Sequence, residues 1–301
     1  MLMIPMKYRN LHSNFPSISE ISFGCMSLEQ DQQLANSLIH KACDFGVNYF
    51  DTADLYQEGN NEALLGVAVK GKREKILLAT KVGNQPNPNG KGWRWNPSKS
   101  YILKAVELSL KRLKTDYIDI YQLHGGTIDD PIEEVIEAFE ILKQQGKIRQ
   151  YGISSIRPNV IAEYAKRSDI VSVMLQYSIL DRRAEEKVLP QLNKNRIGAL
   201  ARGVLAKGIT LKNSSSDYLN YDHKYIDILK DKLNVFSIEE RTHIQTLLRW
   251  VLYNDKLTSA VVGIRTEEQL DEIIGSMNSP ILDKETYDLL SNVLERNYYT
   301  K

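Results

Sequence analysis

Eight short apolar runs alternate with helix-like segments along the chain, and this alternation constrains the fold more than any other feature. Each run has the length of a strand, and apolar residues at helical spacing follow it. Eight such pairs fit in 301 residues, since a closed (β/α)8 barrel needs roughly 250. The sequence therefore predicts an α/β fold, a single-domain (β/α)8 TIM barrel over residues 1–301. A doubly wound open sheet is the alternative, but no G-x-G-x-x-G follows an early strand.

The expected elements follow from periodicity and from Gly and Pro positions. The strands are expected at 21–24, 47–51, 76–80, 117–123, 148–153, 171–175, 197–201 and 258–263. The helices are expected at 31–45, 61–70, 97–113, 131–145, 158–167, 184–195, 238–254, 267–276 and, at the C-terminus, 283–296. Residues 7–20 are expected to form a small hairpin or cap. Two long loops, 83–96 and 203–236, are expected to shape the substrate site.

Polar residues stand where three of these strands end. Asp51 ends the second strand and Tyr56 follows five residues later, while Lys81 and His124 follow the third and fourth. The carboxyl ends of barrel strands carry the active site, so these four side chains are expected to meet. A lysine ammonium stabilises a nearby phenolate, which would let Tyr56 protonate a carbonyl oxygen. Asp51 would hold the lysine, His124 would orient the substrate, and a cofactor would have to supply a hydride.

Taken singly, these residues have structural interpretations that remain open. An aspartate at a strand end is often a cap, a lone lysine can be a surface charge, and a lone histidine is more often a core residue than a catalyst. Trp93 and Trp95 in the loop 83–96 either form an apolar wall over a pocket or pin the loop to the barrel. It is the arrangement of four polar residues at one barrel face that favours a catalytic site.

Seven segments in chain order also carry a family resemblance. They are Phe50–Tyr56 with Gly59 and Glu62–Gly66, Ala79–Lys81, Leu123–His124, Tyr151–Ser155, Gln176–Ser178, Gly263–Thr266 and Glu268–Leu270. With these segments the chain resembles the soluble, bacterial-type aldo-keto reductases. The resemblance implies a barrel that binds NADPH (NADP+) without a Rossmann domain and reduces an aldehyde or ketone to an alcohol. It also implies that Tyr56 is the proton donor, that Asp51 and Lys81 tune it, and that His124 orients the carbonyl.

The resemblance further assigns residues to the nicotinamide end of the cofactor. Ser154 and Gln176 match positions that hold the carboxamide, and Ser155 stands where Asn is more frequent. Arg202 falls where many members stack an aromatic ring on the nicotinamide. A guanidinium plane is also able to stack.

The remaining cofactor positions concern the phosphates. Gly203 and Leu205 belong to a Gly-Val-Leu that replaces a common Ser-Pro-Leu, so backbone N–H groups would serve the pyrophosphate. Arg265 and Gln269, which follow Gly263, match positions that face the adenosine 2′-phosphate. A guanidinium near a helix N-terminus suits a phosphate dianion, so NADPH is expected in preference to NADH.

The composition of the chain limits the kinds of partner that we expect it to bind. With 39 Lys and Arg against 38 Asp and Glu, nothing favours a nucleic-acid or membrane partner. Cys25 and Cys43 form no CxxC or metal-ligand pattern, so no metal and a cytoplasmic location are expected. We expect a small-molecule carbonyl substrate and a monomer, with an oligomer left open.

Two other functions remain as alternatives. One is a cofactor-binding regulatory subunit, because the family resemblance extends to potassium-channel β subunits. The other is an isomerase or aldolase acting on a phosphorylated substrate, in which Lys81 would form a Schiff base.

Overall fold

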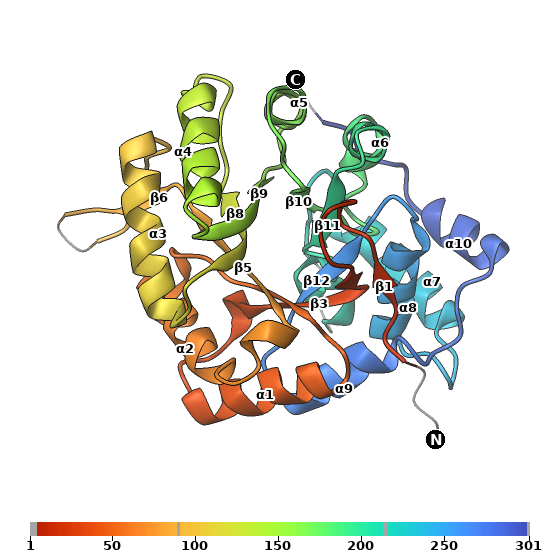
Figure 1. Cartoon of the computed structure of the whole chain (residues 1–301). Helices are drawn as coiled ribbons and strands as arrows, with labels where there is room; N and C mark the ends of the chain where they lie inside the picture. The colour runs from red at the N-terminus through yellow and green to blue at the C-terminus, as the bar shows by residue number, and fades with distance from the viewer. Residues whose placement is uncertain (1–4, 89–90, 213–215, 300–301) are drawn as a thin grey trace.

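The computed structural model describes residues 5–88, 91–212 and 216–299. Eight parallel strands close into a barrel in which spatial neighbours follow chain order (Figure 1). These strands are β3 (Ile21–Gly24), β4 (Tyr49–Asp51), β5 (Leu77–Val82), β8 (Ile118–Leu123), β9 (Ile148–Ser154), β10 (Ser172–Gln176), β11 (Gly198–Arg202) and β12 (Ser259–Gly263). The predicted (β/α)8 barrel is confirmed.

Helices surround the barrel and connect its strands (Figure 1). They are α1 (Gln32–Asp44), α2 (Asn60–Ala68), α3 (Lys99–Leu113), α4 (Ile132–Gln144), α5 (Pro158–Arg167), α6 (Val188–Lys194), α7 (His223–Phe236), α8 (His243–Tyr253), α9 (Glu267–Gly275) and α10 (Lys284–Ser291). Short 3-10 helices are η1 (Cys25–Ser27), η2 (Tyr56–Gly59), η3 (Arg73–Lys75), η4 (Arg183–Glu185) and η5 (Ala206–Leu211). Among the described residues, no helix combines the length and the apolar character that crossing a membrane requires.

Alternate side chains of the strands fill the barrel interior. Tyr49, Ala79 and Ile120 belong to one buried cluster with Leu11 and Ile18. The last two come from the predicted N-terminal hairpin, in which β1 (Tyr8–Arg9) pairs with β2 (Ile18–Ser19). A Cβ on Gly198, the first residue of β11, would lie 2.3 Å from the Leu11 side chain. The hairpin therefore closes the barrel at the amino ends of its strands.

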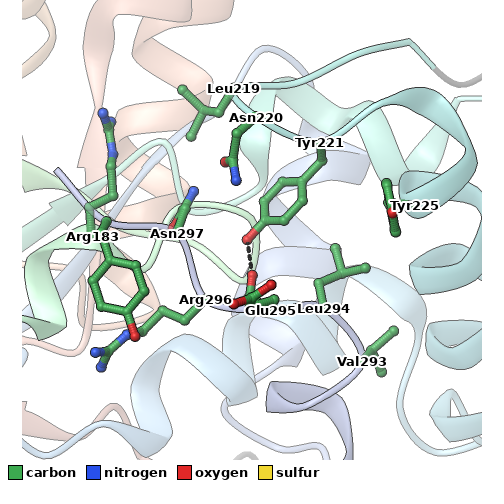
Figure 2. Close-up of a pocket in the computed structure, with 11 residues that line it drawn as sticks. Arg183, Leu219, Asn220, Tyr221, Tyr225, Val293, Leu294, Glu295, Arg296 and Asn297 are labelled. Carbon is green, nitrogen blue, oxygen red and sulfur yellow. Dashed lines mark hydrogen bonds between the residues drawn. The ribbon is translucent and has the colours of Figure 1, made fainter. Parts of the chain in front are cut away.

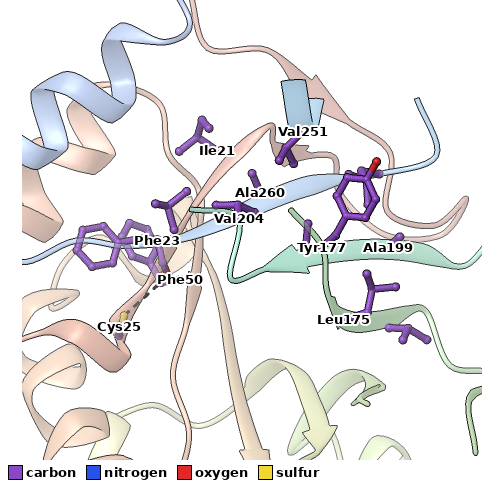
Figure 3. Packing of buried hydrophobic residues seen from close by; sticks show 14 of the residues in the cluster. Ile21, Phe23, Cys25, Phe50, Leu175, Tyr177, Ala199, Val204, Val251 and Ala260 are labelled. Carbon is purple, nitrogen blue, oxygen red and sulfur yellow. Dashed lines mark hydrogen bonds between the residues drawn. The ribbon is translucent and has the colours of Figure 1, made fainter. Parts of the chain in front are cut away.

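The other face of each strand packs against the helices. The rings of Phe23 and Phe50 stack there with centroids 5.8 Å apart, and Figure 3 shows Cys25 beside them. Cys25 is fully buried in this cluster. Fully burying an aromatic or aliphatic side chain contributes about 1.5–3 kcal/mol. The strand ends at the barrel mouth are therefore carried by a rigid frame.

The structure corrects the expected helix around 238–254. Its counterpart α8 begins at His243, because Thr242 forms a capping box with Gln245. A further helix, α7, lies within the segment 203–236, which the sequence presented as a loop. Residues 213–215 of that segment lie outside the described part of the chain.

Three further segments also differ from expectation. The C-terminal helix stops at Ser291, and residues 292–299 continue as an irregular tail. The segment 83–96 contains a hairpin of β6 (Asn84–Pro86) and β7 (Trp93–Trp95); its residues 89–90 are outside the described ranges. The expected helix 184–195 is divided between η4 and α6.

Candidate active site

The alternation of side chains along the strands places polar groups at the barrel mouth. In β5 and β8, the period of two that points Ala79 and Ile120 inward also points Lys81 and Gln122 inward, one step nearer the carboxyl end. Asp51, the last residue of β4, pairs with Ala79 in the register. The barrel frame therefore brings Asp51, Lys81 and Gln122 together directly above the apolar interior.

Lys81 and Asp51 form a buried charge pair. The Lys81 ammonium donates to Asp51 Oδ2 over 2.5 Å and to the carbonyl of Thr52 over 2.6 Å. Gln122 Nε2 donates to the other carboxylate oxygen over 3.0 Å. Burial alone lowers the pKa of Lys81, but the charge of Asp51 and the hydrogen bonds to Asp51 and Tyr56 outweigh it and raise the pKa. Lys81 therefore keeps its positive charge at neutral pH, fixed in one position.

Tyr56 lies next to the charged Lys81 ammonium. The Lys81 ammonium lies 3.3 Å from the Tyr56 hydroxyl and 4.8 Å from the centre of its ring. The chain turns back immediately afterwards, because Gln57, Glu58 and Gly59 all have left-handed φ angles of 50°, 57° and 90°. Gln57 Nε2 holds this turn by donating to the carbonyl of Leu28 over 2.6 Å. Two non-glycine residues in this region indicate local backbone strain beside Tyr56.

His124 stands edge-on to Tyr56, with ring centroids 5.8 Å apart. Its backbone N–H donates to the carbonyl of Val82 over 2.7 Å, which extends the pairing of β8 with β5. Burial, together with the charges of Lys81 and Arg202, lowers the pKa of His124 to about 3. The imidazole is therefore neutral near pH 7 and carries one N–H donor and one acceptor nitrogen.

The structure thus brings together Asp51, Tyr56, Lys81 and His124, as the sequence predicted for the strand ends. It adds Gln122, which the sequence reasoning missed. A signal was available, since Gln122 is a polar residue two positions before His124 in an otherwise apolar inward-facing set. The arrangement presents a phenol, a fixed cation and a neutral imidazole to one point, which suits protonation of a carbonyl oxygen.

A second group of expected residues lies on neighbouring strands. Ser154 ends β9, and Gln176 and Arg202 end β10 and β11, paired with each other in the register. Arg202 Nη1 donates to Gln176 Oε1 over 3.3 Å. Gln176 Nε2 donates to the hydroxyl of Tyr218 over 2.8 Å. Tyr218 is a second residue that the sequence reasoning missed.

Ser155 and Gly203 border this group. The Ser155 hydroxyl oxygen accepts a hydrogen bond from the backbone N–H of Arg157 over 3.2 Å. Gly203 has a φ of +67°, and a Cβ there would lie 3.5 Å from Gln176 Cγ. Glycine therefore suits the left-handed turn after β11, and a Cβ there would make only ordinary van der Waals contact with Gln176. Leu205 lies partly buried in the same turn and packs against the core.

The residues expected to face the adenosine 2′-phosphate lie at the start of α9. Thr266 caps this helix, and its hydroxyl accepts a hydrogen bond from the Gln269 N–H over 3.3 Å. Gln269 Oε1 accepts one from the Arg265 N–H over 3.0 Å, while the side chain of Arg265 is exposed. Gly263 ends β12, and a Cβ there would lie 2.5 Å from the Ser27 hydroxyl. An exposed guanidinium at a helix N-terminus is suited to an anion.

Trp95 connects the hairpin β6–β7 to the barrel mouth. Its indole N–H donates to Asp130 Oδ1 over 2.9 Å. A Cβ on Gly83 would lie 2.5 Å from its ring, and one on Gly125, next to His124, 3.6 Å. Trp95 therefore pins the loop 83–96 to the barrel, whereas Trp93 is 51% exposed.

Comparison with known proteins agrees with this geometry. The model of the Aldo/keto reductase family matches residues 20–295, which includes all eight barrel strands. The chain belongs to the aldo/keto reductase family. This membership makes it an oxidoreductase and accounts for the barrel. Most of the motifs that carried the resemblance lie at or just after the carboxyl ends of the strands, whereas Glu62–Gly66 lies in α2 and Glu268–Leu270 in α9.

Similar proteins and structures span the whole chain. An "Uncharacterized oxidoreductase YqkF" of Bacillus subtilis is 43% identical, over 98% of both chains. The holo form of "aldo-keto reductase AKR11C1 from Bacillus halodurans" is 44% identical with a TM-score of 0.91, over 98% of both chains. Its apo form gives 42% and 0.83 at the same coverage. "Aldo-keto reductase yakc [NADP(+)]" of Schizosaccharomyces pombe is 27% identical, over 89% of this chain and 86% of its own.

Proposed function

We propose that this aldo-keto reductase reduces an aldehyde or ketone to an alcohol, with NADPH as hydride donor and Tyr56 as proton donor. The observation that carries the proposal is the position of the Lys81 ammonium. It lies 2.5 Å from Asp51 and 3.3 Å from the Tyr56 hydroxyl, inside the mouth of the barrel. A fixed cation beside a phenol is what a general acid of this kind needs.

The tetrad of Asp51, Tyr56, Lys81 and His124 divides the work in this proposal, and each residue has a distinct role. As the carbonyl oxygen gains negative charge, Tyr56 gives it the hydroxyl proton and becomes a phenolate. Lys81 stabilises that phenolate, and Asp51 keeps Lys81 charged and stationary. The neutral His124 donates one N–H to the carbonyl oxygen and so orients the substrate. None of these groups needs to move, which lowers the cost of reorganisation.

The residues at the mouth fit the proposed cofactor. NADPH supplies the hydride when bound. Ser154 and Gln176 offer a hydroxyl and an amide for its carboxamide, on the strand ends next to the tetrad. The turn at Gly203 offers backbone N–H groups for the pyrophosphate. The exposed Arg265 is assigned to the 2′-phosphate, and the NADP(+) in the name of the Schizosaccharomyces pombe relative supports this choice of cofactor.

The proposal extends to the domain and its partners. We infer that residues 1–301 act as a single domain on a small-molecule carbonyl substrate, in monomeric form. Trp95 and the hairpin that it pins lie next to His124 through Gly125. These residues would then limit the shape of the substrate.

The test is cofactor binding followed by turnover. NADPH should quench the tryptophan fluorescence at lower concentration than NADH, and aldehydes from a small panel should consume NADPH. Binding without turnover of any aldehyde or ketone would favour the regulatory-subunit alternative. Failure to bind either nucleotide would refute the cofactor assignment and with it the proposed reaction.

A further inference from the structure

The side-chain amide of Gln176 is held from two sides. Arg202 Nη1 lies 3.3 Å from one amide atom, and the Tyr218 hydroxyl lies 2.8 Å from the other. A guanidinium has donors only, so the atom that faces Arg202 must be the amide oxygen. The amide nitrogen then donates to Tyr218. The chemistry of the two neighbours thus allows a single orientation of the amide.

Tyr218 reaches Gln176 from a short, well-defined turn. Tyr218 and Tyr221 exchange backbone hydrogen bonds of 2.9 and 3.0 Å, and Asp222 caps α7 directly afterwards. The Tyr218 side chain is only 8% exposed. Burial, and then the charge of Asp181, raise the pKa of Tyr218. Its hydroxyl therefore stays neutral, accepts from Gln176 and keeps its own proton for a further acceptor.

We propose that Tyr218 is a positioning residue for the nicotinamide end of the cofactor. Its hydroxyl, acting with Arg202, locks the Gln176 amide in one orientation. A primary amide has two N–H groups and two oxygen lone pairs, and the two neighbours use one of each. One N–H and one lone pair remain, in fixed order, to meet the complementary groups of a carboxamide. This inference rests on the proposed function, because it assumes NADPH as the ligand.

Tyr221, in the same turn, provides a matched comparison. Its hydroxyl donates to the carbonyl of Glu295 over 2.7 Å, as the dashed line in Figure 2 shows. Tyr221 and the C-terminal tail line a cavity of about 690 Å³. Both tyrosines are buried, and the hydroxyl of each forms a hydrogen bond to a residue outside the turn. Of the two, only Tyr218 contacts Gln176. Removing each hydroxyl in turn therefore distinguishes an effect on the Gln176 amide from an effect on the stability of the turn.

The experiment compares two phenylalanine variants with two ligands. One ligand is NADPH, and the other is 2′,5′-ADP, which has the phosphorylated adenosine but no nicotinamide. Tyr218→Phe should raise the dissociation constant of NADPH about three- to tenfold, the effect of one neutral hydrogen bond. It should leave that of 2′,5′-ADP unchanged. Tyr221→Phe should change neither constant. Titration calorimetry measures all of them without turnover.

The outcomes separate this inference from the proposed function. An unchanged NADPH constant in Tyr218→Phe would overturn the positioning role. Equal losses in Tyr218→Phe and Tyr221→Phe, or equal losses for both ligands, would assign the hydroxyl to the turn and overturn it as well. If the unmodified protein binds neither ligand, the proposed function itself fails and this inference fails with it.

Discussion

The two halves of the barrel mouth are built in different ways. On the side of β4, β5 and β8, the charge pair of Asp51 and Lys81 is buried and held by strands in register, and the partly exposed Tyr56 and His124 lie against it. On the side of β10 and β11, Gln176 and Arg202 are partly exposed, and Gln176 is held in addition by Tyr218 from a distant turn. The first half is fixed by the barrel, and the second also depends on segments outside it.

This difference separates the residues proposed for proton transfer from the residues proposed for cofactor binding. A proton donor needs a charge at a constant distance, and a strand end beside an apolar interior supplies it with little freedom. A cofactor must enter and leave, and among the residues proposed to contact it Gln176, Arg202 and Arg265 are reached by solvent, whereas Ser154 and Ser155 are buried. Changes on the β4–β5–β8 side should therefore affect turnover or folding, whereas changes on the other side should mainly affect affinity.

The sharpest test of this division is Tyr56→Phe. Loss of the hydroxyl removes the proton donor, and turnover should fall by about 10²–10⁴-fold, the usual contribution of general acid catalysis. The affinity for NADPH should stay the same, because the ring and its surroundings remain. Steady-state kinetics and fluorescence titration measure the two effects. Turnover within tenfold of the unmodified enzyme would remove Tyr56 from the proposed mechanism.

A second test concerns stability. Asp51→Ala leaves the buried Lys81 ammonium without its counter-charge, and breaking such a pair costs about 3–5 kcal/mol. Urea unfolding of the cofactor-free protein measures the loss. The matched control is Glu133→Ala, because Glu133 pairs with Arg167 at the surface and its side chain is 70% exposed. That change should cost no more than about 1 kcal/mol. Similar losses in both variants would contradict the view that the barrel mouth holds a costly buried charge.

The same division explains how far the sequence predicts the site. Asp51, Lys81 and His124 could be located because each follows an apolar run, and strand ends converge in a barrel. Gln122 could have been located by the period of two. Tyr218 could not, because its contact with Gln176 joins residues 42 positions apart and depends on the path of the chain after β11. No periodicity in the sequence encodes that path.

Prediction of the fold from the sequence fails in the same way around α7 and α8. The eight strands and most helices follow from periodicity, but α7 was missed within a segment rich in Ser, Asn, Asp and Tyr. Its signals were present, since Asp222 is its N-cap, and Ile226, Leu229 and Leu233 are buried at helical spacing. The polar composition of the preceding residues concealed them. The helix expected from residue 238 was placed five residues too early, because the capping box at Thr242 was not recognised.

The cofactor half of the mouth is tested by Arg265→Ala. If this exposed guanidinium binds the 2′-phosphate, its loss should weaken NADPH about 10- to 100-fold, as expected for charge-assisted hydrogen bonds. NADH lacks that phosphate and should be affected by less than about twofold. Turnover at saturating NADPH should be retained. An equal loss for both nucleotides would show that Arg265 does not distinguish them.

The smallest effect expected is a pH dependence that arises from His124. Burial lowers the pKa of His124 to about 3 in the folded protein, whereas an exposed histidine has a pKa of about 6.5. Between these values the unfolded chain binds a proton that the folded chain does not. Folding stability should therefore decrease as the pH falls from about 6.5 toward 3, by at most about 1.4 kcal/mol per pH unit.

His124→Gln removes this titration and should flatten the acid side of the stability profile. Urea unfolding at about pH 7 and about pH 5.5 would show a smaller loss in the variant than in the unmodified protein, by about 1 kcal/mol. Some slope should persist, because burial also lowers the pKa of His243. Equal losses in the two proteins would mean that His124 is not held neutral. The contrast between the two halves of the mouth would then weaken at a residue whose ring stands edge-on to Tyr56.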